Sequence, residues 1–204
     1  EEEENEDEAE SAESALLGQG TYSPAPLARG VSRSGGENRY ATSVAVSKRL
    51  FPTGKKAPAV FIASGTSFPD GLTLGALAAY AGGPLLLTPA GEVPSNILSE
   101  VKRLSPPRVY IAGGTGAISA KAESQLEMIV PEVVRLGGKD RYETAQRIAR
   151  EFPAASPRII ATGLDFPDAL VAATSSTKAG RVGAAVLLSR GFKSDATLSE
   201  ALEE

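Results

Sequence analysis

The sequence contains no cysteine and no histidine. These absences exclude thiolate nucleophiles, disulfides, imidazole acid–base chemistry and zinc sites built on Cys or His ligands. Tryptophan is absent too, and aromatic residues make up only 5% of the 204 residues. Because 42% of the residues are hydrophobic, a core can still form. We expect that core to consist mainly of Ala, Val, Leu and Ile.

Long apolar segments and common enzyme motifs are also missing. No apolar run reaches the roughly 20 residues that a membrane-spanning helix needs, so we expect no membrane span. No signal peptide is visible, and an exported protein would have lost its signal or carry it outside these residues. The sequence has neither a G-x-S-x-G elbow nor an Asp-x-Asp pair suited to Mg²⁺. We therefore predict no enzyme activity, no catalytic residue, no cofactor and no metal site.

The charge is distributed unevenly along the chain. Residues 1–14 hold nine acidic side chains and no basic ones. The remaining chain has 16 acidic and 21 basic side chains, a net charge of about +5. Like charges repel, and four Gly and Pro residues follow, so we expect residues 1–28 to be a disordered acidic leader.

Residues 39–136 alternate between helical patterns and short apolar runs. Apolar residues recur at helical spacing or in Ala- and Leu-rich runs at 39–51, 69–82, 94–104 and 119–130. Continuous apolar segments at 57–64, 83–89, 108–114 and 132–136 read as strands. Apolar strands that are each followed by a helix indicate a mostly parallel sheet with helices on both faces. The fold class is therefore α/β.

The chain contains an internal duplication. The pattern Arg-x-Gly-Gly-x-x-Arg-Tyr-x-Thr begins at Arg33 and again at Arg135, an offset of 102 residues. Two further segments recur in the same order at offsets of 98 and 101, namely 68–70 at 166–168 and 85–87 at 186–188. We predict a first copy over 29–134 and a C-terminally incomplete second copy over 135–204. Segment 194–204 aligns with 94–104, and nothing corresponds to the strand at 108–114. The second sheet should therefore have an open edge, which we expect to pair with the first copy, another chain or further residues.

The repeated arginine–glycine pattern precedes a predicted helix in both copies. Glycine lets the backbone approach a ligand, a helix N-terminus favours anions, and arginine binds phosphate or carboxylate with two donors. One interpretation is an anion-binding site formed by Arg33, Gly36, Arg39, Arg135, Gly138 and Arg141. The alternative is a tight turn whose arginines pair with buried carboxylates such as Asp70 and Asp168. Both interpretations stay open at this point.

Two other motifs favour structural roles. Ser67 and Asp165 each precede Phe-Pro and stand three residues before an aspartate, a pattern typical of helix starts. A catalytic or metal-binding Asp70 or Asp168 is disfavoured, because neither has a partner carboxylate at a useful spacing. The glycines at 113–116 could cradle a phosphate, but they match no known phosphate-binding pattern and favour a strand-to-helix turn.

Three further segments accompany the repeated arginine–glycine pattern, namely Ala-Ser-Gly-x-x-Phe-Pro-Asp-Gly-Leu, Gly-Pro-Leu-Leu-Leu-Thr and Val-Tyr-Ile-Ala-Gly-Gly-Thr-Gly-Ala-Ile-Ser. Taken together, the four segments resemble the type 2 cell-wall-binding repeat of bacterial surface proteins. The resemblance covers roughly residues 31–204. Its motif positions are Tyr40, Asp70, Pro84, Leu85, Leu86, Leu87, Tyr142 and Asp168. In the second copy Ala185 stands where the family has proline.

The resemblance implies tandem Toprim-like or flavodoxin-like repeats that attach a secreted protein non-covalently to the cell wall. The implied ligand is an anionic wall polymer, either teichoic-acid-like or an acidic polysaccharide, and not a nucleic acid. Such repeats usually occur three in a row around a pseudo-threefold axis, which implies self-association through repeats in trimer-like packing. Two alternatives remain open: a wall-active hydrolase, and a structural assembly module without a polymer ligand.

Overall fold

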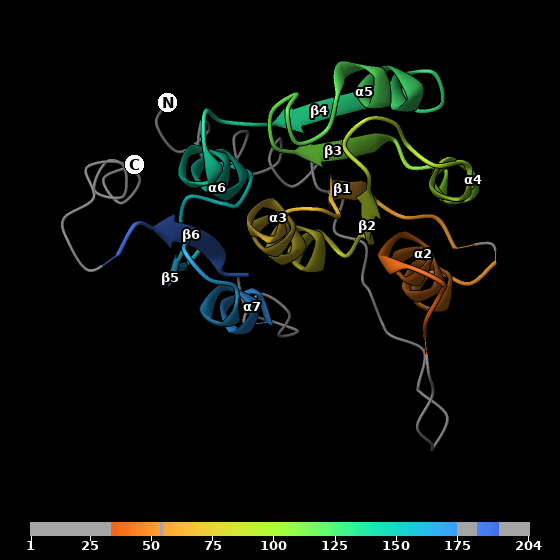
Figure 1. The fold of residues 1–204 in the computed structure, drawn as a ribbon. Coiled ribbons are helices and arrows are strands. Elements are labelled where there is room, and N and C mark those ends of the chain that lie inside the picture. The colour runs from red at the N-terminus through yellow and green to blue at the C-terminus, as the bar shows by residue number, and fades with distance from the viewer. Residues whose placement is uncertain (1–33, 54, 175–182, 192–204) are drawn as a thin grey trace, which may run out of the picture.

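The structure is a computed structural model that describes residues 34–53, 55–174 and 183–191 (Figure 1). The first copy contains α2 (Arg39–Leu50), β1 (Val60–Ser64), α3 (Phe68–Ala81), β2 (Leu85–Thr88), α4 (Ser95–Leu104), β3 (Arg108–Ala112), α5 (Ala120–Glu127) and β4 (Glu132–Leu136). The second contains α6 (Arg141–Ala149), β5 (Arg158–Thr162), α7 (Pro167–Thr174) and β6 (Ala185–Ser189). The predicted leader at 1–28 and the segment at 194–204 lie outside the described residues.

Four parallel strands form the sheet of the first copy, in the order β2-β1-β3-β4. All five residues of β1 are buried, as expected for a central strand covered on both faces. The order 2-1-3-4 is that of flavodoxin-like doubly wound folds. The predicted α/β class with a parallel sheet is confirmed.

Helices of the first copy cover one face of this sheet. Val44 on α2, Ile97 on α4 and Leu126 on α5 belong to one buried cluster with Ile62 and Ile111 of the central strands. Four of these five side chains have no exposed surface, and Val44 has 7%. Burying each such side chain stabilises the fold by roughly 1.5–3 kcal/mol.

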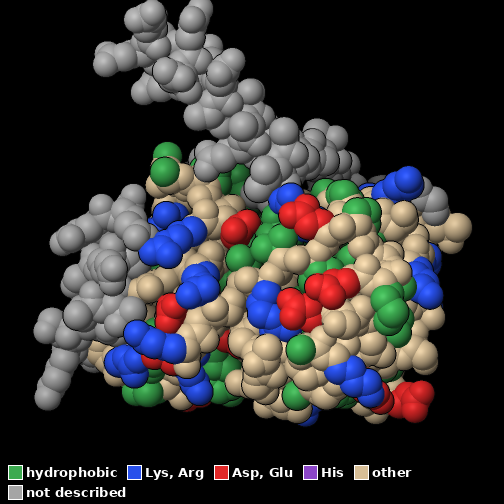
Figure 2. Space-filling view, turned by 90° about the horizontal axis from the view of Figure 1, so that it is seen from above, with side chains coloured by type: hydrophobic (Ala, Val, Ile, Leu, Met, Phe, Trp, Pro, Cys, Tyr) green, Lys and Arg blue, Asp and Glu red, His purple; other side chains and the backbone are tan. Residues whose placement is uncertain are grey.

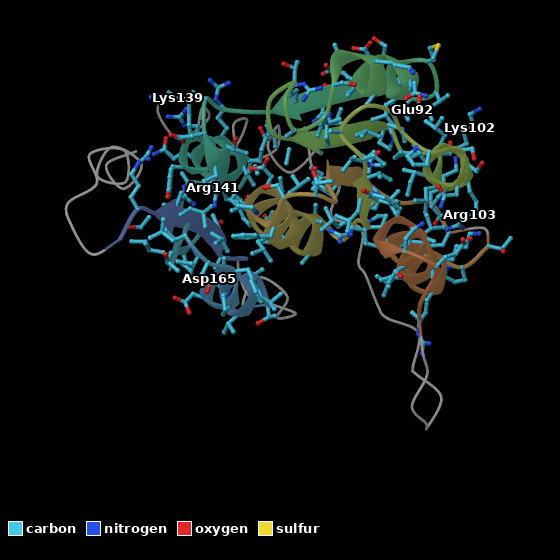
Figure 3. All side chains as sticks on the ribbon, viewed as in Figure 1. Glu92, Lys102, Arg103, Lys139, Arg141 and Asp165 are labelled. Atoms are coloured by element: carbon cyan, nitrogen blue, oxygen red, sulfur yellow. The ribbon has the colours of Figure 1, made fainter. Side chains whose placement is uncertain are left out.

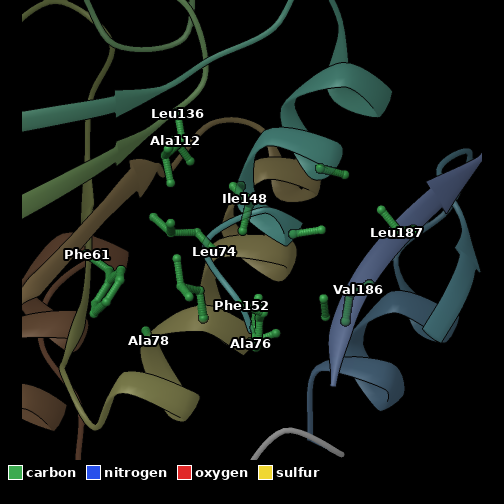
Figure 4. Close-up of a cluster of buried hydrophobic side chains, with 14 of the residues drawn as sticks. Phe61, Leu74, Ala76, Ala78, Ala112, Leu136, Ile148, Phe152, Val186 and Leu187 are labelled. Carbon is green, nitrogen blue, oxygen red and sulfur yellow. The ribbon is translucent and has the colours of Figure 1, made fainter. Parts of the chain in front are cut away.

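The opposite face is covered by α3 and by the second copy together. Leu74 on α3 lies in a cluster that includes Phe61 of β1 and also Ile148, Phe152 and Leu187 of the second copy (Figure 4). Alanines at many positions of α3 allow the close approach of these layers. The two copies therefore share one hydrophobic core, and α3 is their common element.

The second copy repeats the strand register of the first. Ile160 of β5 lies opposite Leu187 of β6, as Ile62 of β1 lies opposite Leu86 of β2. Among the described strands, β5 pairs with β6 alone, so the first copy does not occupy its open edge. Ile160 is 47% exposed, whereas Ile62 is fully buried.

The predicted elements of the first copy all occur, with shifts at their ends. The helix predicted over 119–130 ends at Glu127, because Ile129 donates its N–H to the Leu126 carbonyl in a tighter turn. The strand at the predicted boundary of the two copies, β4, continues to Leu136, and its last residues pair with β3. The sheet of the first copy therefore extends beyond residue 134.

Candidate functional site

The repeated motif caps the helix that follows it. The Asn38 side chain accepts hydrogen bonds from the N–H groups of Tyr40 and Ala41, both at 3.0 Å. Asp140 does the same for Tyr142 and Glu143, at 3.0 and 2.9 Å. Helix N-termini attract anions through free N–H groups. Here the protein's own side chains already bind two of these groups in each copy.

The second glycine of each Gly-Gly pair is required by close packing. Gly36 donates its N–H to Thr42 Oγ1 at 3.0 Å, and Gly138 donates to Thr144 Oγ1 at 3.0 Å. A Cβ atom on Gly36 would lie 2.5 Å from the Cβ of Ala41, and one on Gly138 would meet the next helix equally closely. The hydrogen bond from glycine to threonine therefore holds the loop against the helix in both copies.

The Arg-Tyr pair of each motif holds the loop after the next strand. The Arg39 guanidinium donates to the Gly65 carbonyl, and Arg141 Nη1 donates to the Gly163 carbonyl at 2.7 Å. The rings of Tyr40 and Tyr142 lie against the same glycines, and a Cβ there would overlap each ring. Arg39 remains exposed and Arg141 is half-buried. Both arginines thus combine a structural hydrogen bond with solvent access.

Arg135, the first arginine of the second motif, lies in an internal ion pair. Its Nη2 is 2.9 Å from Glu123 Oε2, and its Nη1 donates to the Gly113 carbonyl at 2.8 Å. Only 17% of its side chain is exposed. The equivalent Arg33 lies outside the described residues. Arg135 therefore fixes α5 and the β3–α5 loop to β4.

The motif aspartates occupy different surroundings. Asp70, in the first turn of α3, is 9% exposed, whereas Asp168 is exposed. Within the described part of the chain neither carboxylate forms an ion pair. Burial raises the pKa of Asp70 above its ordinary value, and the nearby Arg141 opposes this. The interpretation that the motif arginines form ion pairs with these aspartates does not hold for the three described arginines. Arg39 and Arg141 donate to backbone carbonyls, and Arg135 pairs with Glu123.

The predicted helix caps are met only in part. Ser67 occupies the N-cap position of α3, but its side chain makes no capping hydrogen bond. Asp165 accepts a 2.8 Å hydrogen bond from the Phe166 N–H just before α7. The glycine run after β3 forms a strand-to-helix turn in which Ala117 donates its N–H to the Gly114 carbonyl at 2.9 Å.

The apolar motif of β2 belongs to the core of the sheet. Leu86 is fully buried, Leu85 and Leu87 are half-buried, and Pro84 accepts a 3.0 Å hydrogen bond from the Phe61 N–H. In the second copy Ala185 donates its N–H to the Pro157 carbonyl at 2.9 Å. Proline has no N–H and could not make this bond. The exchange of Pro for Ala therefore adds a hydrogen bond at the start of β6.

Basic side chains, which sequence reasoning missed, lie in the last turns of α2 and α4, two helices that pack together, and in the loop after α2. We define this α2–α4 basic patch as Lys48, Arg49, Lys55, Lys56, Lys102 and Arg103. Lys55 is half-buried and the other five are exposed. Three Lys/Arg dipeptides mark these positions in the sequence, but their convergence depends on the packing of α2 against α4.

One buried acid lies under this patch. Glu100 is 1% exposed and accepts a 2.6 Å hydrogen bond from Ser47, which joins α4 to α2. It also accepts 2.7 and 2.8 Å bonds from Arg103. Burial raises the pKa of Glu100, but these bonds and the nearby charge of Lys48 outweigh it, so the net pKa lies below the ordinary value. The carboxylate is charged and holds the two helix ends together.

A second group of cations lies at the other end of the molecule. Figure 2 shows Lys and Arg side chains over the end that carries α6, with acidic side chains among them. Here Arg147 pairs with Glu143 at 2.7 Å and Arg190 with Asp140 at 2.5 Å. Figure 3 separates this end, with Lys139 and Arg141, from Lys102 and Arg103 on α4. The cations near α6 therefore lie among acidic side chains that pair with two of them.

Comparison with known proteins identifies the repeats. The family model for cell wall binding domain 2 (CWB2) matches residues 33–123 and 135–204, which begin at the two copies of the arginine–glycine motif. The chain belongs to the CWB2 family. Its role in binding cell walls follows from this membership, and the resemblance seen in the sequence is confirmed.

Curated relatives and solved structures are similar to much of this chain. The chain is 33% identical over 155 residues to N-acetylmuramoyl-L-alanine amidase LytC of Bacillus subtilis, covering 76% of this chain and 31% of that protein. It is 28% identical over 141 residues to the Amidase enhancer of the same organism, covering 69% and 19%. Structures of Cwp8 and Cwp6 from Clostridium difficile match with TM-scores of 0.73 and 0.65 at 30% and 31% identity. Each covers 82% of this chain and 28% of the matched chain. The CWB2 chain thus spans less than a third of these relatives.

Within residues 34–53, 55–174 and 183–191, no group of three or more acidic side chains is placed to hold a metal ion. No helix in the described ranges is both long and apolar enough to cross a membrane.

Proposed function

We propose that this CWB2 chain anchors a secreted protein to the cell wall by binding an anionic wall polymer, either teichoic-acid-like or an acidic polysaccharide. The observation that carries the proposal is the α2–α4 basic patch. It contains six cations, and the described acid Glu100 is buried and bound to Arg103, one of the six. Such a surface attracts phosphate or carboxylate groups.

A helix dipole accounts for only part of this arrangement. Lys48, Arg49, Lys102 and Arg103 lie in the last turns of α2 and α4, where cations stabilise a helix by about 0.3–1 kcal/mol each. Lys55 and Lys56 lie beyond α2, in the loop before β1, where no dipole favours them. Bringing these cations together costs repulsion that a polyanion would relieve.

The motif arginines supply a second set of contacts in this proposal. Arg39 is exposed and can donate to anionic groups of the polymer. Arg141 is half-buried and can donate to another part of the same polymer with the nitrogens not bound to backbone. Gly36 and Gly138 let the loops beside them pack closely. Arg135 contributes by stabilising the fold and not by contacting the polymer, because Glu123 already binds its guanidinium. Individual exposed contacts are weak, but a polymer with repeated charges engages several at once.

We infer that the chain binds without catalysing a reaction on the wall. The sequence has no His or Cys, and Asp70 and Asp168 do not form a carboxylate pair. LytC is named an amidase, and the chain matches 31% of it. Incubation with purified walls tests this inference: the expected result is no release of wall fragments. Turnover that disappears in Asp70→Asn or Asp168→Asn would overturn it.

We further infer that α7 packs against another repeat. Thr73 on α3 is 1% exposed, while Val171, its counterpart on α7, is 69% exposed and Leu170 is 49% exposed. The apolar face of α7 is thus equivalent to a covered face of α3. Light scattering should show association through repeats at high concentration that weakens in Val171→Lys. A wild-type monomer at every concentration would contradict this inference.

A pair of charge-matched variants tests the polymer-binding proposal. Lys48→Gln/Lys102→Gln removes two exposed cations of the patch. Lys121→Gln/Arg147→Gln removes two cations that lie elsewhere in surface ion pairs. At low salt, we expect the first variant to lose about tenfold in affinity for purified walls and to show a weaker salt dependence. The control should bind nearly as well as wild type. Equal losses in both variants would refute the assignment of the patch.

A further inference from the structure

The junction between the two copies brings two aromatic rings and two opposite charges together. Phe68 and Asp70 lie in the first turn of α3, Phe166 precedes α7, and Arg141 begins α6. The two phenylalanine rings contact each other edge to face, with centroids 6.1 Å apart. The Arg141 guanidinium carbon lies 5.7 Å from the centroid of the Phe68 ring. Both copies are needed to form this cluster, and Figure 3 shows Arg141 on the side of α6 that faces α3.

Asp70 has an unusual environment for a buried carboxylate. It is 9% exposed, yet no described residue donates a hydrogen bond to it or forms an ion pair with it. It lies against Gly113, where a Cβ atom would be 2.5 Å from Asp70 Oδ2. Its oxygens are not among the fully buried side-chain atoms of the described residues that lack a partner, so they stay within reach of solvent at the junction. The charge of Arg141 acts on this carboxylate. A carboxylate to which no described residue donates can accept hydrogen bonds from a ligand.

The aromatic rings remain open to solvent despite the packing around them. Phe68 is 40% exposed although the second copy covers much of α3, and Phe166 is 51% exposed. Neither ring belongs to the two buried hydrophobic clusters. Large exposed aromatic rings beside polar groups are typical of binding surfaces.

We propose that this junction binds a neutral, hydroxyl-rich sugar ring of the same wall polymer. Asp70 would accept hydrogen bonds from sugar hydroxyls, and Arg141 would donate to a hydroxyl or ring oxygen. The apolar C–H face of the sugar would lie on Phe68 and Phe166. Asp70 and Arg141 cancel in charge, so the junction selects a neutral sugar, whereas the α2–α4 basic patch selects anionic groups. The inference rests on the proposed function and names the part of the polymer bound here.

The salt dependence of binding distinguishes contacts to a neutral sugar from contacts to charged groups. Hydrogen bonds and stacking on a neutral sugar depend weakly on ionic strength, whereas contacts to exposed polymer charges are screened. The test is sedimentation of the chain with purified walls at low salt and at about 1 M salt, where the Debye length is about 3 Å. The variants are Asp70→Asn and the double variant Phe68→Ala/Phe166→Ala. Glu127→Gln removes an exposed acid on α5 and serves as the charge control.

We expect wild type and Glu127→Gln to retain binding at high salt. Asp70→Asn and Phe68→Ala/Phe166→Ala should each lose about tenfold or more of this salt-resistant affinity. The melting temperature of Asp70→Asn should equal or exceed that of wild type, because Asn relieves the burial of an unpartnered charge. Lower binding with undiminished stability is a result that a purely structural Asp70 would not give.

Two outcomes would overturn the inference while leaving the proposed function intact. One is wild-type binding at low salt that vanishes entirely at high salt. The other is unchanged high-salt binding in both junction variants. Absence of wild-type binding at low salt would instead defeat the proposed function, and the two failures are therefore distinguishable.

Discussion

Replacement of Glu100 by Gln should lower stability and strengthen binding at the same time. Glu100 is 1% exposed, and the three hydrogen bonds that it accepts from Ser47 and Arg103 measure 2.6–2.8 Å. A hydrogen bond to a charged group contributes about 1.5–3 kcal/mol. Because the Arg103 side chain is 29% exposed, its released guanidinium can reach water, which limits the loss. We expect Glu100→Gln to cost about 2 kcal/mol, or about 4–8 °C in melting temperature.

The pH dependence of this loss has a defined sign. The pKa of Glu100 in the folded protein lies below its ordinary value, because the bonds from Arg103 and Ser47 and the charge of Lys48 outweigh burial. The stabilisation is therefore complete above the ordinary glutamate pKa and is lost as the pH falls through the folded-state value. The stability difference between wild type and Glu100→Gln should shrink over that range in thermal melts.

The same substitution raises the net charge of the α2–α4 basic patch by one. At a separation of several ångströms in a solvent-rich surface, one added charge contributes about 0.5–1 kcal/mol to the attraction of a polyanion. We expect two- to fivefold tighter wall binding at low salt, about what that energy corresponds to. Ser47→Ala is the matched control, since it removes the 2.6 Å hydrogen bond without changing charge. If Glu100→Gln weakens wall binding, or Ser47→Ala strengthens it equally, the reasoning is refuted.

Three further substitutions test the fold. Gly113→Ala should lower the free energy of unfolding by about 2–4 kcal/mol in thermal melts, because the φ of Gly113 is +92° and an added Cβ would lie 2.5 Å from a carboxylate oxygen. Gly91→Ala is the control and should lower it by less than about 1 kcal/mol, because an added Cβ there has nothing within 4 Å. Asp140→Ala should cost about 1–2 kcal/mol through the lost cap. Burial raises the pKa of Asp140, but its hydrogen bonds and the charge of Arg190 lower it below the ordinary value. This contribution should therefore be complete above the ordinary aspartate pKa and be lost in melts as the pH falls through the lower folded-state value. Leu126→Ala should cost about 2–5 kcal/mol in denaturant unfolding, whereas Met128→Ala, 76% exposed, should change stability by at most about 0.5 kcal/mol.

Periodicity and repetition were enough to predict the order of the elements. Helical and apolar patterns persist over whole segments, so they survive errors at individual residues. The duplication extends to the strand register, since the paired Ile62 and Leu86 of the first copy recur as the paired Ile160 and Leu187 of the second. The sequence did not reveal that α3 serves as the shared core of both copies, because that depends on how the copies pack.

The role of the repeated motif was harder to predict. Asn38 and Asp140 stand directly before their helices, and a search for N-cap residues there could have found them. The partners of Arg39 and Arg141 are backbone carbonyls 26 and 22 residues away, and no sequence pattern marks a carbonyl as an acceptor. Likewise, Ser47 and Glu100 are 53 residues apart, so the α2–α4 basic patch becomes visible only when the two helices pack.

The most direct test of the account is sedimentation of the chain with two preparations of the same purified cell walls, one intact and one stripped of its anionic polymer. At low salt we expect stripping to reduce binding at least about tenfold, and added salt to weaken binding to the intact walls. Equal binding to both preparations would contradict the claim that exposed cations of the CWB2 repeats hold an acidic polymer.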